Sequence, residues 1–419
     1  MTKLEKQIDA IALAARSASR ALAKAPTAQK NRALKAIAAK LRSSRVEILR
    51  ANARDMAAGA NKGMAKAMLD RLMLDAGRLE KIAASVEAVA KLPDPVGKIT
   101  ERKTLKNGLK LEKMRVPLGV IGIVFESRPN VTVDAAVLCL KSGNATILRG
   151  GSEAIHSNVA LGKAIQAGLK AAGLPRETVS VIASTDRAAV RAMLTRDKFI
   201  DVIIPRGGHG LIQAVIELSS IPVIRHDIGN CHVYVDKAAD LLSAEKISVN
   251  AKVSRPGVCN AMEHLLVHQG VAKKFIPEMV HAFHRDGVEV RGDKAVQKLA
   301  RGVHPLPKRE WSEEYLDLIV GIKVVKSLDE AIAHINTYGS HHSDSIISRD
   351  KKACERFLNE VDSAAVYSNA STRFTDGGEF GLGAEIGIST QKLHARGPMA
   401  LEELCSQKWV IRGQGQVRG

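Results

Sequence analysis

The chain has 419 residues and a formal net charge of +19, with 45% apolar and only 3% aromatic residues. This apolar share can build packed cores, and the length fits two or three domains. Ordinary numbers of glycine (33) and proline (13) exclude a collagen-like or disordered chain. No run of about 18 uninterrupted apolar residues occurs, so a membrane span is not expected.

The N-terminal region, up to about residue 90, is Ala-rich and helical in period. Leu34, Ile37 and Leu41 recur at the spacing of one buried helical face. Pro93 and Pro95 then end helix formation. The first 26 residues include Glu5 and Asp9 and lack the unbroken apolar core of a signal peptide, so we expect a cytoplasmic protein.

A hairpin signal follows. Two extended stretches, Ile99–Leu105 and Leu109–Arg115, flank a Lys-Asn-Gly turn, and their many charges fit a ribbon that leaves the main body. A second extended segment, Lys408–Arg412, lies near the C-terminus.

From Val116 onward, short apolar runs alternate with helical stretches. We expect strands at Val120–Phe125, Thr146–Leu148, Val179–Ile182, Ile200–Ile204, Val223–Ile224, His232–Val235, Leu265–Val267, Leu318–Val325, Ser345–Ile347 and Ala364–Val366. We expect helices at Val131–Lys141, Glu153–Ala172, Arg187–Thr195, Leu211–Leu218, Leu241–Ala251, Ala272–Phe283 and Asp329–Asn336. This alternation predicts an α/β fold with parallel sheets covered by helices on both faces.

Cys259 is the first candidate for chemistry. It lies in Ser-Arg-Pro-Gly-Val-Cys-Asn, residues 254–260, a turn-forming stretch between a helix and a strand. Proline and glycine keep such a loop irregular, so the thiol can project into a cleft, and Arg255 can favour the thiolate. Cys231, between His226 and His232, is the one rival; Cys139 lies in a helical run, Cys354 on a surface helix and Cys405 in an acidic helical turn.

Two glycine-rich turns follow strands and precede helices. They are Arg149-Gly150-Gly151-Ser152 and Pro205-Arg206-Gly207-Gly208-His209-Gly210. Free N–H groups at such a helix start can hold a phosphate, although an ordinary strand-to-helix turn has the same pattern. Neither the His226, Cys231, His232 group nor the His341, His342, Asp344 group has the spacing of a metal site, so no metal is expected.

Motifs throughout the chain resemble, in order, the gamma-glutamyl phosphate reductase (glutamate-5-semialdehyde dehydrogenase) family of the aldehyde dehydrogenase superfamily. The matching segments are 116–120 (VPLGV), 125–130 (FESRPN), 141–144 (KSGN), 149–152 (RGGS), 205–208 (PRGG), 229–236 (GNCHVYVD), 255–260 (RPGVCN), 314–317 (EYLD) and 381–387 (GLGAEIG).

The resemblance implies a Rossmann-like cofactor domain, an α/β catalytic domain with the nucleophilic cysteine, and a small β oligomerisation element. We assign residues 1–97 and 117–228 to the NADP-binding domain, 229–370 to the catalytic domain, and 98–116 and 371–419 to the oligomerisation hairpin and C-terminal strand. The expected partner is a second copy of the chain, because an exposed strand edge favours pairing. The glutamate 5-kinase that makes the unstable substrate, L-glutamyl 5-phosphate, must be a separate chain. Functional coupling to that kinase is expected.

The resemblance also implies the reaction, the second step of proline biosynthesis from glutamate. NADPH-dependent reduction of L-glutamyl 5-phosphate would give glutamate 5-semialdehyde and phosphate. Cys259 would form a thioester, and the Asn130 amide with the Cys259 N–H would stabilise the oxyanion. Glu314 matches the glutamate that holds the nicotinamide ribose, and Arg149, Ser152, Arg206, Gly207 and Gly208 are the further cofactor candidates.

Two departures from hydrolytic relatives refine this expectation. Asp227 stands where those enzymes carry a water-activating Glu, and its shorter side chain reaches a water less well. Ser152 stands where many NAD-preferring relatives carry Glu, so with Arg149 nearby the 2′-phosphate of NADPH is accepted.

The residues that hold the substrate's amino and carboxylate groups stay open. Arg128, Arg255, Asn369, Ser371 and Thr372 are candidates by position, and a structural role is an equal alternative for each.

Two other functions compete. A CoA-acylating aldehyde dehydrogenase shares the cysteine and uses CoA in place of phosphate. A nucleic-acid-binding protein fits the charge, but two Trp, four Tyr and seven Phe offer few stacking platforms, so binding of small anions is favoured.

Overall fold

The computed structural model describes residues 1–226 and 228–418. The chain divides into two compact units, each described by itself here. The first unit contains residues 1–225, 382–387 and 399–419, and the second contains residues 226–381 and 388–398. Among the described residues, no helix combines the length and apolar character needed to cross a membrane.

The first unit begins with a series of helices, as the apolar periodicity predicts. They are α1 (Lys3–Leu22), α2 (Thr27–Ser43), α3 (Arg45–Asn61), α4 (Lys66–Leu72) and α5 (Ala76–Lys91). The Thr2 hydroxyl accepts a hydrogen bond from the Glu5 N–H, and the Glu5 carboxylate accepts one from the Thr2 N–H. This pair of bonds is a capping box at the start of α1. Helix α5 ends at Lys91, just before Pro93 and Pro95, as expected.

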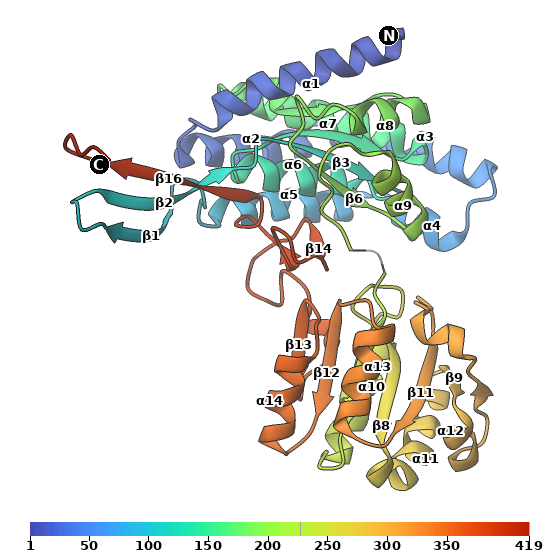
Figure 1. The fold of residues 1–419 in the computed structure, drawn as a ribbon. Coiled ribbons are helices and arrows are strands. Elements are labelled where there is room, and N and C mark those ends of the chain that lie inside the picture. The colour runs from blue at the N-terminus through green and yellow to red at the C-terminus, as the bar shows by residue number, and fades with distance from the viewer. Residues whose placement is uncertain (227, 419) are drawn as a thin grey trace. The chain divides into compact units, whose positions relative to one another are not determined.

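A parallel four-stranded sheet forms the centre of this unit. Its strands are β3 (Val120–Phe125), β4 (Ala145–Gly150), β5 (Val179–Val181) and β6 (Val202–Arg206), in the order β5-β4-β3-β6. The connecting helices are α6 (Asn130–Lys141), α7 (Ile155–Ala171), α8 (Arg187–Leu194) and α9 (His209–Leu218), with short 3₁₀ turns at Ser152–Ala154 and Arg176–Thr178. Helices α1, α8 and α9 share one apolar core with the sheet, whereas α6 and α7 pack against β4 and β5 with α2 and α5 beside them (Figure 1).

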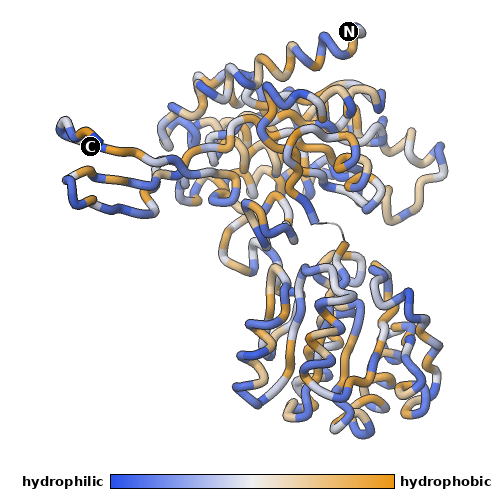
Figure 2. Tube along the Cα trace, in the orientation of Figure 1, coloured by the Kyte–Doolittle hydropathy of each residue, from blue (hydrophilic) through white to orange (hydrophobic). Residues whose placement is uncertain are grey.

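The predicted hairpin and C-terminal strand form one antiparallel sheet. Strands β1 (Ile99–Thr104) and β2 (Lys110–Pro117) pair with each other, and β16 (Cys405–Arg412) pairs with β2 (Figure 1). Much of the β1–β2 ribbon is hydrophilic (Figure 2), which fits its charged sequence. Cys405 begins β16, so its assignment to an acidic helical turn is wrong; pairing with Pro117 extends the strand there.

The second unit contains a parallel sheet of seven strands in the order β10-β9-β11-β8-β7-β12-β13. These strands are β7 (Cys231–Val235), β8 (Met262–His268), β9 (Glu289–Gly292), β10 (His304–Pro305), β11 (Ile319–Val325), β12 (Ser343–Ile347) and β13 (Ala365–Ser368). Its helices are α10 (Leu241–Val253), α11 (Gln269–Arg285), α12 (Lys294–Leu299), α13 (Leu328–Tyr338) and α14 (Lys351–Glu360), with 3₁₀ turns at Lys308–Ser312 and Thr372–Phe374. Two further strands, β14 (Gly387–Ser389) and β15 (Gly397–Met399), pair where the chain passes between the units.

Alternating side chains build one core on each face of this sheet. Val233 and Val235 of β7 join the core under α10, α11 and α12, while Tyr234 between them joins the core under α13 and α14. The α/β class with doubly wound parallel sheets is therefore confirmed. The sequence did not predict strands β9 and β10 or helix α12. The predicted strand at Val223–Ile224 is wrong, because Val223 forms only an isolated bridge to Ile203.

The compact units group some residues in a different way from the domains that we expect, whose functional roles stay a prediction. Residues 371–381 and 388–398 belong to the second unit and not with β16, and the β1–β2–β16 sheet belongs to the first unit. The reason is local packing: the turn at Thr372–Phe374 bonds to the loop before β8, as described below.

Candidate active site

Cys259 lies in the loop that joins α10 to β8. Helix α10 ends at Val253, and β8 begins at Met262. Cys259 lies in the turn between them, three residues before β8. All five cysteines lie within the described residues, and Cys259 alone is half-buried, while the other four are buried. Burial raises the pKa of Cys139 and Cys405 to about 12, and it also raises the pKa of Cys231 and Cys354. Cys259 is therefore the accessible thiol, and Cys231 is no rival nucleophile.

The main chain of this loop is held from two sides. Gly229 lies against it so closely that a Cβ at Gly229 would be 2.0 Å from the Cys259 carbonyl oxygen. The Cys231 thiol donates to that same oxygen at 3.2 Å. On the other side, the Asn260 amide donates to the Thr375 carbonyl oxygen at 2.9 Å, and the Thr372 hydroxyl donates to the Asn260 carbonyl oxygen at 2.8 Å.

Two guanidinium groups belong to the same loop region. Burial lowers the pKa of Arg373, the charge of Arg255 lowers it further, and the Cys259 sulfur opposes both effects. The Arg373 Nε donates to the Ser254 hydroxyl at 3.0 Å, so its side chain is fixed on the cysteine loop. Arg255 was a sequence candidate, whereas Arg373 was missed, although it directly follows Ser371 and Thr372.

Glu314 approaches the cysteine loop through Gly229. Its Oε1 accepts a hydrogen bond from the Gly229 N–H at 2.8 Å. Gly229 therefore touches Cys259 on one side and Glu314 on the other, and the structure brings these two predicted residues together. Asp227, the predicted replacement for a water-activating Glu, lies outside the described residues.

Asn369 and Ser371 follow β13 in the second unit. Both line a cavity of about 1150 Å³ beside α10 and α14, and Cys259 is not among its lining residues. The Asn369 amide is engaged with the backbone of Ser348, accepting from its N–H at 3.0 Å and donating to its carbonyl at 2.9 Å. The Ser371 hydroxyl accepts from the Arg373 N–H at 3.3 Å. These contacts favour the structural alternative for Asn369, whereas Thr372 and Ser371 support the Cys259 and Arg373 region.

A cavity of about 590 Å³ in the first unit contains two of the predicted cofactor residues. Arg149 and Ser152 line it where β4 ends, together with Glu126, Glu153 and Arg187. Arg149 is 8% exposed, and its Nε has no hydrogen-bond partner among the described residues. Burial lowers the pKa of this guanidinium, and Arg187 adds to the effect while Glu153 opposes it. A buried arginine with an unused donor fits a phosphate group of a dinucleotide.

The second glycine turn follows β6 and starts α9. Contrary to the expected free N–H groups, the Gly208 N–H donates to the Glu126 carboxylate at 3.0 Å. Gly210 lines the cavity, but Arg206, Gly207 and Gly208 do not. The Arg206 side chain lies beside Gly387, where a Cβ would be 2.5 Å from its Nη1. Burial raises the pKa of Asp134, and the charge of Arg206 partly opposes that rise. The turn therefore positions Glu126 and α9 around the cavity without lining it.

In the first unit, Arg128 lies just before α6 and Asn130 is the first residue of that helix. The Asn130 amide donates to the Asp134 carboxylate at 2.8 Å, which fixes its orientation. Burial raises the pKa of Asp134. The Arg128 carbonyl accepts from the Val131 N–H at 3.0 Å in the turn that enters the helix.

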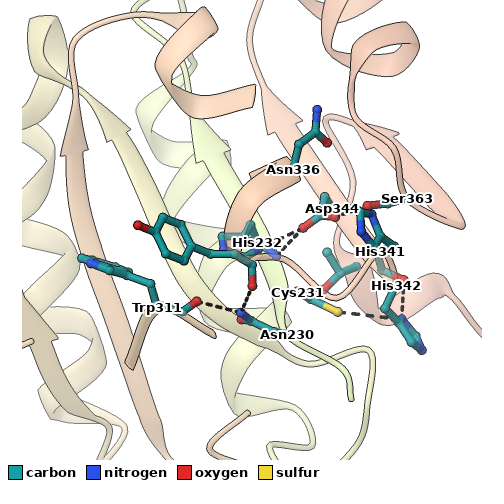
Figure 3. A network of polar contacts seen from close by, with 12 residues as sticks. Asn230, Cys231, His232, Trp311, Asn336, His341, His342, Asp344 and Ser363 are labelled. Carbon is teal, nitrogen blue, oxygen red and sulfur yellow. Dashed lines mark hydrogen bonds and ion pairs between the residues drawn. The ribbon is translucent and has the colours of Figure 1, made fainter. Parts of the chain in front are cut away.

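The described residues contain no group of three or more His, Cys, Asp or Glu side chains that could hold a metal ion. His226 bonds to the Ile388 carbonyl at 3.2 Å, and His232 bonds to Asp344 at 3.2 Å in a fully buried pair (Figure 3). These histidines therefore have local structural partners.

One α/β unit carries a half-buried cysteine in a loop with arginines, and the other carries a cavity lined by two arginines and two glutamates at its strand ends. This pair of units defines an oxidoreductase of the aldehyde dehydrogenase-like fold. The model of the aldehyde dehydrogenase family matches residues 2–297. The gamma-glutamyl phosphate reductase of Halothermothrix orenii is 54% identical over 416 residues, which are 99% of this chain and 100% of that protein. That of Moorella thermoacetica is 53% identical over 404 residues, 96% of this chain and 97% of that protein.

Solved structures give the same relationship. The crystal structure of gamma-glutamyl phosphate reductase from Thermotoga maritima matches with a TM-score of 0.97 and 46% identity, covering 98% of this chain and 100% of that one. The chain belongs to the aldehyde dehydrogenase family, with the gamma-glutamyl phosphate reductases, and is an oxidoreductase. The resemblance in the sequence motifs is thereby confirmed.

Proposed function

We propose that this chain reduces L-glutamyl 5-phosphate to L-glutamate 5-semialdehyde with NADPH, releasing phosphate, in the synthesis of proline from glutamate. The observation that carries the proposal is the half-buried Cys259 beside Arg255 and Arg373, tied to Glu314 through Gly229. The name gamma-glutamyl phosphate reductase, borne by relatives that match this chain over nearly its full length, supports the same substrate.

In the proposed reaction, the Cys259 thiolate attacks the carbonyl carbon of the acyl phosphate. A C–S bond forms, the bond from that carbon to the phosphate oxygen breaks, and phosphate leaves with the electron pair. Arg255 and Arg373 supply positive charge for the anionic substrate and the departing phosphate. The Asn130 amide, held by Asp134, and the Cys259 N–H are the donors that we assign to the oxyanion.

Reduction completes the cycle. When bound, the nicotinamide cofactor supplies a hydride to the thioester carbon. Collapse of the resulting hemithioacetal breaks the C–S bond, which releases the aldehyde and restores the Cys259 thiolate. No water is consumed, in agreement with the shorter Asp227 in place of Glu.

The cofactor proposal rests on the cavity in the first unit. We assign the 2′-phosphate of NADPH to Arg149 and Ser152, because the Arg149 Nε is an unused donor and Ser152 brings no negative charge. Glu314 is assigned to the nicotinamide ribose. Arg206, Gly207 and Gly208 act by positioning the start of α9 in this proposal, since they do not line the cavity.

We further propose a cytoplasmic homo-oligomer in which the β1–β2–β16 sheet contributes to assembly, functionally coupled to a glutamate 5-kinase. The outer strands of that sheet leave hydrogen-bonding groups available to a second copy.

The test uses the stable product and runs the reaction backwards. Purified protein is given glutamate 5-semialdehyde and NADP with phosphate, with CoA, or with neither. We expect NADPH formation only with phosphate, or with arsenate in its place, and no activity in Cys259→Ala. Oxidation dependent on CoA, or efficient oxidation with no acceptor, would overturn the proposal.

A further inference from the structure

Cys231 is a buried cysteine that the proposed reaction does not use. It is the first residue of β7, an inner strand of the seven-stranded sheet that lies between β8 and β12. Its side chain has no exposure, and its thiol donates to the Cys259 carbonyl oxygen at 3.2 Å. The sheet therefore places a hydrogen-bond donor against the main chain of the nucleophile.

We propose that Cys231 is a positioning residue for Cys259, its thiol holding the Cys259 carbonyl so that the nucleophile's sulfur points to the substrate. This inference rests on the proposed function, in which Cys259 attacks the acyl phosphate. Cys231 touches no reacting atom, so it acts through the Cys259 main chain.

The burial of Cys231 keeps it a thiol, and a thiolate could not donate this bond. Desolvation raises its pKa well above the ordinary value, and the negative charges of Asp344 and Cys259 add to the rise. The two cysteines therefore divide their roles: the half-buried Cys259 is the nucleophile, and the buried Cys231 stays protonated as a donor.

The Cys231 thiol is itself held by a chain of polar contacts. The His342 Nδ1 lies 3.8 Å from the Cys231 sulfur (Figure 3). The same nitrogen lies 2.9 Å from the Ser343 hydroxyl. The Ser343 hydroxyl lies 2.6 Å from the Thr375 hydroxyl, and the Thr375 carbonyl accepts from Asn260. The contacts thus link the Cys259 carbonyl to the side chain of Asn260, the next residue of the same loop.

This arrangement predicts a kinetic cost that packing alone does not explain. Loss of the donor removes the hydrogen bond that β7 gives to the Cys259 carbonyl, and the free energy typical of such a loss corresponds to about a factor of ten in rate. The cost should appear in every reaction of the Cys259 sulfur, whether or not substrate is present.

The experiment compares Cys231→Ala, Cys231→Val and Cys231→Ser in the full chain. Ala and Val remove the donor, Val keeps the volume filled, and Ser keeps a donor. Cys354→Ala is the matched control, because Cys354 is also buried in the second unit and its thiol donates to the Ser348 carbonyl at 3.6 Å. The readouts are kcat and KM with semialdehyde, NADP and phosphate, and the rate of Cys259 alkylation by iodoacetamide over a range of pH.

We expect kcat and the alkylation rate to fall about tenfold in both Cys231→Ala and Cys231→Val, with the KM for NADP unchanged. Cys231→Ser should recover most of both rates, and Cys354→Ala should match the wild type. Wild-type rates in Cys231→Val would overturn the inference, even if Cys231→Ala were too unstable to assay. Activity retained in Cys259→Ala would instead refute the proposed function, so the two failures are distinguishable.

Discussion

A Cβ placed on Gly229 would be 2.4 Å from the Cα of Cys259 and 2.0 Å from its carbonyl oxygen. Real Cβ atoms do not approach backbone atoms so closely, so the main chains of these two residues meet only because residue 229 has no side chain. The same Gly229 donates its N–H to Glu314. A residue without a functional group therefore sets the spacing between the proposed nucleophile and the proposed ribose ligand.

Gly229→Ala should abolish most activity. The methyl group must displace backbone atoms of the Cys259 loop, which cannot rotate away as a flexible side chain would, and overpacking of this kind costs about 1–3 kcal/mol of stability. We expect kcat to fall at least about a hundredfold, since small misplacements of reacting groups have effects of that size. Steady-state kinetics and urea unfolding measure the two effects.

The matched control for this change is Gly77→Ala in α5, where the nearest atom to the new Cβ is a side-chain oxygen of Asp75 at 3.3 Å. It should keep wild-type kcat. Full activity in Gly229→Ala would show that the cysteine loop tolerates displacement.

Ser152→Glu should change the cofactor preference. Ser152 lines the same cavity as the buried Arg149, and a carboxylate there would repel a 2′-phosphate and favour a free ribose. We expect the KM for NADP to rise about tenfold, which corresponds to about 1.4 kcal/mol. The KM for NAD should fall or stay unchanged.

Side-by-side assays with both cofactors decide this prediction, and Ser152→Ala serves as the uncharged comparison. An equal rise in both KM values would mean that the substitution disturbs the cavity in general and that the 2′-phosphate binds elsewhere.

Arg373→Gln should weaken the binding of phosphate. The guanidinium is fixed on Ser254 and lies in the electrostatic neighbourhood of Cys259 and Arg255. Loss of one charge-assisted contact to an anion costs about 1.5–3 kcal/mol, so the KM for phosphate should rise about tenfold or more. Phosphate titration at saturating semialdehyde measures this effect.

Arg356→Gln on α14 is the comparison for Arg373, because Arg356 is a half-exposed arginine paired with Asp329 and Glu360. It should leave the KM for phosphate unchanged. If Arg373→Gln shifts only the KM for NADP, the assignment of Arg373 to the phosphate is wrong.

The buried ion pair between Lys252 and Glu263 predicts strongly coupled stability effects. Nζ and Oε2 are 2.6 Å apart, and both side chains have no exposure. Burial raises the pKa of Glu263 to about 7 and lowers the pKa of Lys252, so each charge depends on the other. Glu263→Gln leaves Lys252 buried without a counter-charge and should cost about 3–5 kcal/mol of unfolding free energy.

The double variant Lys252→Met/Glu263→Leu should recover most of that loss, because it removes both buried charges. Urea unfolding of the single and double variants measures the coupling. Equal losses in the two would show that the Glu263 contact to the Leu316 N–H, at 3.3 Å, dominates instead.

Local patterns were sufficient for much of the fold and for selecting Cys259 as the candidate nucleophile. The α/β alternation, the β1–β2 hairpin and the C-terminal strand follow from apolar periodicity and turn residues, and each lies where the sequence predicts it. Cys259 stands out because Pro256 and Gly257 keep its loop irregular. Strands β9 and β10 escaped because Glu289–Gly292 and His304–Pro305 are short and polar, so neither has a period to detect.

The tertiary structure decided the roles of residues whose chemistry is unremarkable in isolation. Gly229 and Cys231, just before and at the start of β7, meet the Cys259 loop because β7 lies beside β8 in the sheet. Arg373 comes from a turn after β13 and reaches the same loop through its bond to Ser254. Burial likewise distinguishes the inaccessible thiol of Cys231 from the half-buried thiol of Cys259. The spacing of residues along the chain does not encode this difference. Sequence determines which groups are present and which local turns carry them, whereas contact distance and desolvation arise only when distant segments pack together.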